Sequence, residues 1–262
     1  MENSKNSEVV VRFPPSPTGM LHIGSVRTAL FNYFFAKQNG GKIILRMEDT
    51  DKERSKKEFE ENIIAGFEWL NIKFDSFYRQ SERTEIYKNE LEKMIKEGSA
   101  YISKEEPTEE GKRTEVIRLK NPKKVITFTD MLRGEISVDP SDLGDFVIAR
   151  SIDDPLYHLA VVVDDALMGI THVIRGDDGL ANTPRQILIQ EALGYARPAY
   201  AHIPFVLGAD KSKLSKRHGA LSLLEYREMG YLPEAIINFL STLGWSTQSS
   251  HNQTDESREI FS

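Results

Sequence analysis

The chain has 262 residues, enough for one large domain or for two to three small ones. It contains no cysteine, which excludes disulfides and cysteine-based zinc sites and suits a reducing cytoplasm. With 34 basic against 40 acidic residues the net charge is −6, which argues against indiscriminate nucleic-acid binding, so any RNA contact has to use a local patch. No run approaches the ~18 apolar residues of a membrane helix, and we expect a cytoplasmic protein without a membrane partner.

The first informative stretch, residues 9–35, predicts a strand, a loop and a helix. Residues 9–11 are three β-branched valines, which favour a buried strand, and the prolines and glycine of residues 14–19 then end it. Apolar residues recur at helical spacing over residues 26–34. At such a strand-to-helix junction, unpaired amides and the helix dipole favour an anion, and phosphate is the natural candidate.

This junction is not a P-loop. Gly19 and Gly24 have the spacing of that motif, but Gly24 meets Ser25 directly, without the lysine that a P-loop requires. What remains is His22, whose imidazole can donate to phosphate, and Gly24, which lets a nucleotide approach the backbone closely.

A second strand is predicted over residues 42–47 and ends in three carboxylates within residues 48–51. Cation binding, recognition of an ammonium group and a solvated acidic turn all remain open for them. Two helices follow, over residues 59–70 and 86–95, the second ending near Gly98. We expect residues 78–83, between the helices, to form a polar loop.

The middle of the chain predicts a small inserted module. Residues 103–114 are charged and lack apolar periodicity, and short strand patterns come next. These strands are expected around residues 115–119, 125–128, 135–138 and 146–150.

A second strand-to-helix unit follows the module. We expect buried strands at residues 155–163, which end in Asp164 and Asp165, and at residues 171–175. A helix should then begin with Thr183 as its N-cap and Pro184 at its first position, and should end at Gly194. Two such units separated by an insertion predict a split nucleotide-binding sheet.

The last strand, expected over residues 200–207, leads into a basic loop. Four cations lie within seven residues of this loop, namely Lys211, Lys213, Lys216 and Arg217. The loop suits a polyanion, although a solvated basic turn remains the alternative. Two helices are expected between residues 221 and 245, the first stopped by Gly230 and the second opened around Pro233. The final residues read as the start of a further element, so we expect a truncated chain.

Four segments in this order resemble one family. PPSPTGMLHIGS is similar to the HIGH segment of class I aminoacyl-tRNA synthetases, in its glutamyl-tRNA synthetase version with Ser25 in place of the second histidine, and KLSKR is similar to the KMSKS loop. RMEDTD and VIRGDD lie between them and also match the family. The resemblance extends from about residue 9 to residue 245.

The resemblance implies an α/β fold with a split Rossmann-like parallel sheet, an inserted small α+β module for the tRNA acceptor end, and a C-terminal helical stem-contact region. On this division, residues 1–84 and 157–208 form the catalytic domain, residues 85–156 the reduced insertion, and residues 209–262 the KLSKR loop with the start of the stem-contact domain.

The implied reaction is glutamate-tRNA ligation. The α-carboxylate of L-glutamate attacks the α-phosphorus of ATP, pyrophosphate leaves, and the terminal ribose of tRNA(Glu) attacks the glutamyl-adenylate. Such a reaction needs no protein nucleophile, so positioning and charge stabilisation must carry the catalysis. ATP implies Mg²⁺, but no ligand constellation in the sequence identifies its protein partners. A monomer is expected.

The resemblance also assigns site residues. The ATP-binding residues would be His22, Gly24, Ser25, Asp178, Lys213 and Lys216, of which His22, Lys213 and Lys216 are the catalytic groups. The glutamate-binding residues would be Arg12, Ser16, Glu48, Tyr157 and Arg175. From the residues alone, Arg12 and Arg175 each end a strand and can present a planar fork to a carboxylate, although a surface salt bridge is the commoner fate of an arginine.

Other functions stay open at this point. One alternative is the short glutamyl-Q-type paralogue that glutamylates a modified base of tRNA(Asp), and another is a non-catalytic tRNA-binding relative. Glutaminyl-tRNA synthetases are also similar, but they typically carry Glu and Asn where this chain has Ser16 and Thr18, and they normally lack an arginine at position 175. The chain departs from its family at Gly179, where a histidine is frequent.

Overall fold

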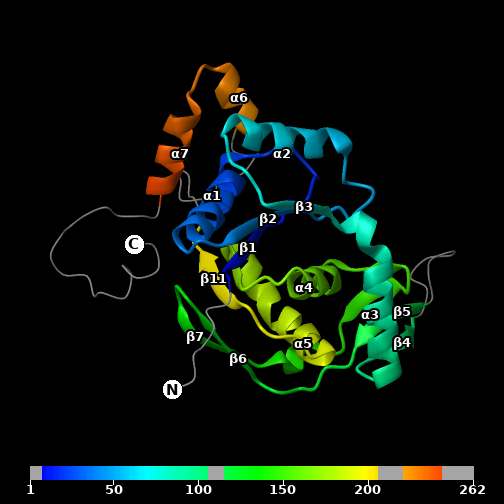
Figure 1. Ribbon diagram of the computed structural model, residues 1–262. Helices are drawn as coiled ribbons and strands as arrows, with labels where there is room; N and C mark the ends of the chain where they lie inside the picture. Colours follow the sequence, from blue (N-terminus) through cyan, green and yellow to red (C-terminus); the bar gives the residue numbers. More distant parts are fainter. Residues whose placement is uncertain (1–7, 106–114, 206–220, 244–262) are drawn as a thin grey trace.

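The computed structural model describes residues 8–105, 115–205 and 221–243 (Figure 1). The strands are β1 (Val10–Phe13), β2 (Lys42–Met47), β3 (Ser76–Arg79), β4 (Ala100–Lys104), β5 (Glu115–Leu119), β6 (Ile126–Asp130), β7 (Gly134–Val138), β8 (Val147–Ser151), β9 (Asp154–Pro155), β10 (His172–Gly176) and β11 (Ala199–Ile203). The α-helices are α1 (Ile23–Gln38), α2 (Lys57–Trp69), α3 (Thr84–Glu97), α4 (Tyr157–Leu167), α5 (Thr183–Leu193), α6 (Leu223–Glu228) and α7 (Pro233–Thr242). Three short 3₁₀ helices are η1 (Gln80–Arg83), η2 (Pro140–Leu143) and η3 (Asp177–Asn182).

The central sheet is parallel and split, as the sequence predicted. β1, β2 and β3 form one parallel sheet, and β10 pairs in parallel with β11 in a second one. The two sheets meet where the amide of Thr171, just before β10, donates to the carbonyl of Val10 in β1 at 2.9 Å. The neighbour order is therefore β3-β2-β1-β10-β11, and the strands on the two sides of β1/β10 come from parts of the chain that an insertion separates.

The inserted residues form two structures. β4, β5, β8 and β9 make an antiparallel sheet, whereas the β6–β7 hairpin joins β11 and extends the central sheet. All four strands expected after residue 114 are confirmed, and β4 is an addition. The division of the chain into the three parts given above stays a prediction.

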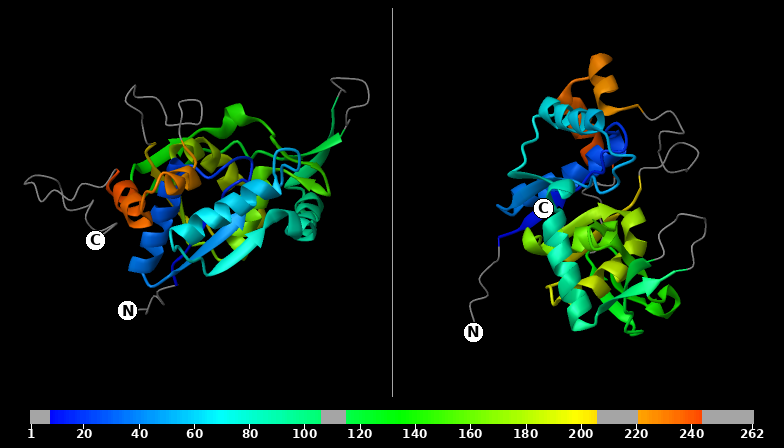
Figure 2. Two further views of the ribbon diagram at one scale, coloured as in Figure 1. Left: turned by 90° about the horizontal axis from the view of Figure 1, so that it is seen from above. Right: turned by 90° about the vertical axis from the view of Figure 1, so that its right-hand side faces the viewer.

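Helices cover both faces of the central sheet (Figures 1 and 2). Alternate residues such as Val11 and Ile43 pack with α1 on one face, while Ile44 belongs to a core with α3, α4 and α5 on the other. Because side chains alternate along a strand, Arg12 and Arg46 point to the same face as Ile44, toward α4. Charged side chains thus enter the sheet's α4 face, close to where β1 and β2 end.

Three local predictions were wrong. Residues 155–163 are mostly helix α4. Residues 159–165 of this helix are all buried, and periodicity cannot distinguish such a short apolar run from a strand. Part of the expected polar loop is β3, which pairs with β2. Thr183 is the first residue of α5 and not its N-cap, which is Asn182. The expected stops at Gly98 and Gly194 are confirmed, both in the left-handed conformation.

Replacing Gly41 with alanine is expected to destabilise the fold. A Cβ at this position would lie 2.2 Å from the carbonyl oxygen of Val9, a backbone atom that β1 holds in place. The strands would have to separate locally, which costs about 1–3 kcal/mol of unfolding free energy. Urea denaturation checks this, with Lys73→Ala in an exposed loop as the control. Equal denaturation midpoints for the two variants would contradict the expectation.

Within the described residues, no helix combines the length and the apolarity needed to cross a bilayer.

Candidate amino-acid and nucleotide site

One cavity of about 810 Å³ lies at the carboxyl ends of β1, β2, β10 and β11. This edge of an open parallel sheet, where the strand order changes direction, is where such folds bind ligands. Nine of the residues that the sequence assigned to substrates line it: Arg12, Ser16, His22, Gly24, Ser25, Glu48, Tyr157, Arg175 and Asp178. The remaining two, Lys213 and Lys216, lie outside the described residues.

His22 caps the helix that begins at the cavity. Its backbone is extended, and its ring Nδ1 accepts the amide of Ser25 at 3.3 Å. Because Nδ1 accepts, the ring proton belongs on Nε2, which lies 3.0 Å from Ser25 Oγ. A Cβ on Gly24 would lie 3.1 Å from Nδ1, so glycine leaves the imidazole room beside the first turn of α1.

The guanidinium of Arg12 has one nitrogen held by a carboxylate and another without a partner. It is only 1% exposed, and its Nε donates to Asp165 Oδ1 of α4 at 3.1 Å. Its Nη1 is buried without a hydrogen-bond partner. A buried guanidinium nitrogen without an acceptor is costly, and a carboxylate in the cavity would satisfy it.

Arg46 connects the carboxylates behind the cavity. It is fully buried and donates to Asp165 at 2.8 Å and to Glu48 at 3.0 Å. Burial by itself lowers the pKa of Arg46, but Asp165, Glu48 and Asp164 outweigh it and raise this pKa above its usual value. Burial raises the pKa of Glu48, although the ion pair with Arg46 partly lowers it. The charges of this cluster depend on one another and fix Glu48 at the cavity wall.

Sequence reasoning missed the part that Arg46 plays. The usable signal was its place in the buried strand of residues 42–47, where a charge needs a partner. Asp164 and Asp165 were noticed only as the end of an apolar run. Both are buried in α4, Asp165 against Arg12 and Arg46 of the sheet and Asp164 against η1 and α3.

Asp164 ties α4 to η1 and α3. Its Oδ2 accepts from Gln80 at 3.0 Å and from Tyr87 at 2.7 Å, and its Oδ1 accepts from Arg83 at 2.7 Å. The side chain is completely buried. This carboxylate therefore holds η1 and α3 against the helix that supports the cavity.

Arg175 is held without a direct carboxylate partner. Its Nε donates to His202 at 3.0 Å, its Nη1 to Gln186 at 2.8 Å and its Nη2 to Thr183 at 2.8 Å. Burial lowers the pKa of Arg175. A Cβ at Gly179 would lie 2.4 Å from Cδ and Nε of Arg175. Glycine at this position therefore leaves the space that the Arg175 side chain occupies.

The remaining lining comes from loops and helix ends. Tyr157 begins α4, Asp178 lies in η3, and Ser16 lies in the proline loop after β1, where its carbonyl accepts the amide of Thr18 at 2.8 Å. The amide of Glu48 donates to the carbonyl of Pro15 at 2.9 Å, so the ends of β1 and β2 are joined.

The segment before residues 206–220 lines this cavity, and the segment after them contacts residues that line it. Phe205, at one side, lines it. At the other side Ser222 forms an isolated antiparallel bridge with His22, and the amide of Leu223 donates to the carbonyl of Leu21 at 2.7 Å. Residues 222 and 223 therefore lie beside the HIGH-like loop.

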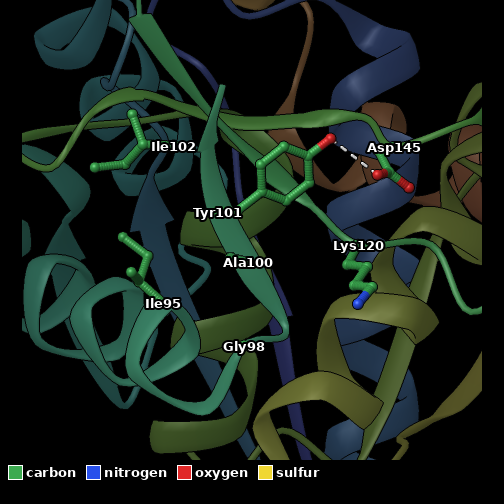
Figure 3. Close-up of a pocket in the computed structure, with 7 residues that line it drawn as sticks. All are labelled: Ile95, Gly98, Ala100, Tyr101, Ile102, Lys120 and Asp145. Carbon is green, nitrogen blue, oxygen red and sulfur yellow. Dashed lines mark hydrogen bonds between the residues drawn. The ribbon is translucent and has the colours of Figure 1, made fainter. Parts of the chain in front are cut away.

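A second hollow, of about 600 Å³, lies between α3 and the antiparallel sheet of the inserted module (Figure 3). Its lining is Ile95, Gly98, Ala100, Tyr101, Ile102, Lys120 and Asp145. The hydroxyl of Tyr101 donates to Asp145 at 2.9 Å. None of the predicted substrate residues that the structure describes lies there.

Comparisons with known proteins agree with this geometry. The family model described as tRNA synthetases class I (E and Q), catalytic domain, matches residues 8–116 and 103–261. A glutamate–tRNA ligase of Aquifex aeolicus is 48% identical over 290 residues, which cover 98% of this chain and 60% of that protein. A glutamate–tRNA ligase 1 of Petrotoga mobilis is 49% identical over 260 residues, covering 90% of this chain and 56% of that protein.

A solved structure is also similar. The crystal structure of a glutamate tRNA ligase from Elizabethkingia meningosepticum, in complex with its amino acid, has a TM-score of 0.84 and 35% identity, and the match covers 97% of this chain and 64% of that one. The chain thus spans about 60% of the length of these relatives. Since the family model matches nearly the whole chain, the protein belongs to the class I tRNA synthetases of the glutamate and glutamine group, whose catalytic domain it matches.

Proposed function

We propose that this protein activates L-glutamate with ATP and transfers it to the 3′-terminal ribose of tRNA(Glu). The observation that carries the proposal is the cavity itself, where two buried arginines and one glutamate converge beside a histidine-capped helix start. The named relatives support the same reading. The substrates are those that the resemblance implies, and the charges around the cavity are compatible with them.

Glutamate has two carboxylates and one ammonium group, and the cavity offers complementary charges. Arg12 has its free Nη1, Arg175 keeps a charge that no direct partner neutralises, and Glu48 suits the ammonium. Ser16 and Tyr157 complete the proposed pocket from the proline loop and the start of α4. Glutamine would leave a buried guanidinium facing a neutral amide, which strongly disfavours it.

ATP is proposed to bind at the start of α1. The amides and dipole of this helix terminus favour phosphate, and Nε2 of His22 carries the proton that it could donate. Gly24 and Ser25 would allow the nucleotide to approach, and Asp178 would contact it from η3. Lys213 and Lys216 are proposed to stabilise the departing pyrophosphate, which suits a reaction that needs charge stabilisation and no protein nucleophile.

Mg²⁺ is proposed only as the companion of ATP. Among the residues that the structure describes, no group of three or more His, Asp or Glu side chains is arranged to hold a metal ion. The ion would therefore be bound mainly through the phosphates of the nucleotide. The protein is proposed to act as a monomer.

Glutamate-dependent exchange between ATP and pyrophosphate tests the activation step. We expect exchange with L-glutamate in the presence of tRNA and at least a hundredfold less with L-glutamine, because the pocket recognises a second negative charge. Lys216→Ala should lower kcat by roughly 10²-fold or more, since a charge on the leaving group would lose its partner. Equal exchange rates with both amino acids would contradict the proposed pocket.

Charging assays identify the tRNA that accepts glutamate. Purified tRNAs for Glu, Gln and Asp are compared with radiolabelled glutamate, and tRNA(Glu) is expected to be charged. Modification of tRNA(Asp) alone would instead identify a glutamyl-Q-type enzyme, and no charging at all would favour a non-catalytic relative.

A further inference from the structure

We propose that His202 and Asp130 are positioning residues that orient Arg175 toward the substrate. Neither residue lines the cavity. The inference rests on the proposed function, in which Arg175 binds a carboxylate of glutamate. It adds two residues that the motifs of the sequence did not indicate.

Asp130 is fixed by backbone amides on both of its oxygens. Its Oδ1 accepts the amides of Leu132 and Arg133 at 3.0 and 3.1 Å, and its Oδ2 accepts the amide of His202 at 3.1 Å. The same Oδ2 lies 2.6 Å from His202 Nδ1. Both side chains are completely buried.

This carboxylate determines the tautomer of His202. An ionised aspartate can only accept hydrogen bonds, so Nδ1 of His202 must carry a proton. Burial lowers the pKa of His202, although its hydrogen bond to Asp130 opposes this, so the ring is neutral near pH 7 and its Nε2 has a free lone pair. Nε2 can therefore accept a hydrogen bond from Arg175.

The lone pair of His202 accepts from Arg175 Nε at 3.0 Å, and Thr183 Oγ1 lies 3.2 Å from the same nitrogen. β10 and β11 pair so that Arg175 and His202 are direct neighbours in register. Hydrogen bonds thus connect the carboxylate of Asp130 to the imidazole of His202, and this imidazole to the guanidinium of Arg175.

Arg12 and Arg175 differ in how closely a carboxylate approaches the guanidinium. Arg12 forms an ion pair directly with Asp165, so much of its charge is already compensated. Arg175 instead meets three neutral acceptors, and the nearest carboxylate in its hydrogen-bond chain stands one imidazole away. Three hydrogen bonds therefore orient the guanidinium, while its charge stays available to an anionic substrate.

Asp130 comes from the inserted part of the chain. It ends β6, whose hairpin with β7 extends the central sheet beside β11. The insertion therefore supports the glutamate pocket from behind.

Kinetics of glutamate-dependent, tRNA-supported ATP–pyrophosphate exchange on the full chain test the proposal. His202→Leu removes the acceptor, and we expect the KM for glutamate to rise about tenfold while the KM for ATP stays within twofold. His202→Gln should restore most of the affinity, because its Oε1 can accept from Arg175 near the position of Nε2. Asp130→Asn offers an amide to Nδ1, which moves the proton to Nε2 and should raise the KM as His202→Leu does.

The control is His172→Gln, at the opposite end of β10 from Arg175, which should leave both KM values unchanged. If circular dichroism shows that His202→Leu is unfolded, Asp130→Asn decides the question. An unchanged KM for glutamate in folded variants, or an equal rise in the KM for ATP, would overturn the positioning role alone. No exchange in the unaltered protein would overturn the proposed function together with it.

Discussion

Replacing Arg12 with lysine is expected to lower kcat/KM for glutamate by roughly 10²–10³-fold. The ammonium of lysine can keep the ion pair with Asp165, but it has no second nitrogen placed where Nη1 now lies unpaired. The planar guanidinium can contact Asp165 with one nitrogen and offer another to the carboxylate that we propose it binds. A single ammonium group cannot do both. Steady-state ATP–pyrophosphate exchange at varied glutamate concentration measures the loss.

Arg150→Lys is the matched control. Arg150 is exposed on β8 and pairs loosely with Asp154 at 3.6 Å, so the same chemical change there should leave kcat/KM as it was. If Arg12→Lys lost less than threefold while remaining folded, Nη1 would not be the group that receives the carboxylate.

Replacing Asp164 with alanine is expected to destabilise the fold by about 3–5 kcal/mol. The carboxylate accepts from Gln80, Arg83 and Tyr87, and it also lies 3.8 Å from Arg46. Without it, Arg46 and Arg83 lose a counter-charge, and the buried hydroxyl of Tyr87 loses its acceptor. Because Asp164 attaches η1 and α3 to α4, the loss falls on the contact between these three helices.

Urea unfolding followed by circular dichroism measures this loss. Asp153→Ala provides the comparison, since that side chain is 65% exposed and only meets Lys88, and its denaturation midpoint should not move. A midpoint for Asp164→Ala equal to that of the Asp153 variant would show that the buried hydrogen bonds are worth far less than their geometry implies.

Local chemistry was enough to predict most elements of this fold. The prolines after Val11, the helical spacing from Val26 and the glycines at 98 and 194 predict a strand end, a helix and two helix stops, and each is confirmed. These features are readable because the backbone preference of proline and glycine acts within a few residues. The apolar run of residues 155–163 was misread because burial on all sides erases the periodicity that separates helix from strand.

The candidate site divides in the same way. The residues that carry recognisable motifs, such as His22, Glu48 and Arg175, could be singled out from the sequence because their neighbours along the chain mark them. The sequence does not predict which groups hold these side chains. Arg46 and its partner Asp165 are 119 residues apart in the sequence, and His202 and Asp130 are 72 residues apart. The sequence by itself determined the elements and the chemical types available at the ends of the strands. Only the tertiary structure decided which charge compensates which, because electrostatic and hydrogen-bond energies depend on distance in space and on exclusion of water, and neither is written in the order of the residues.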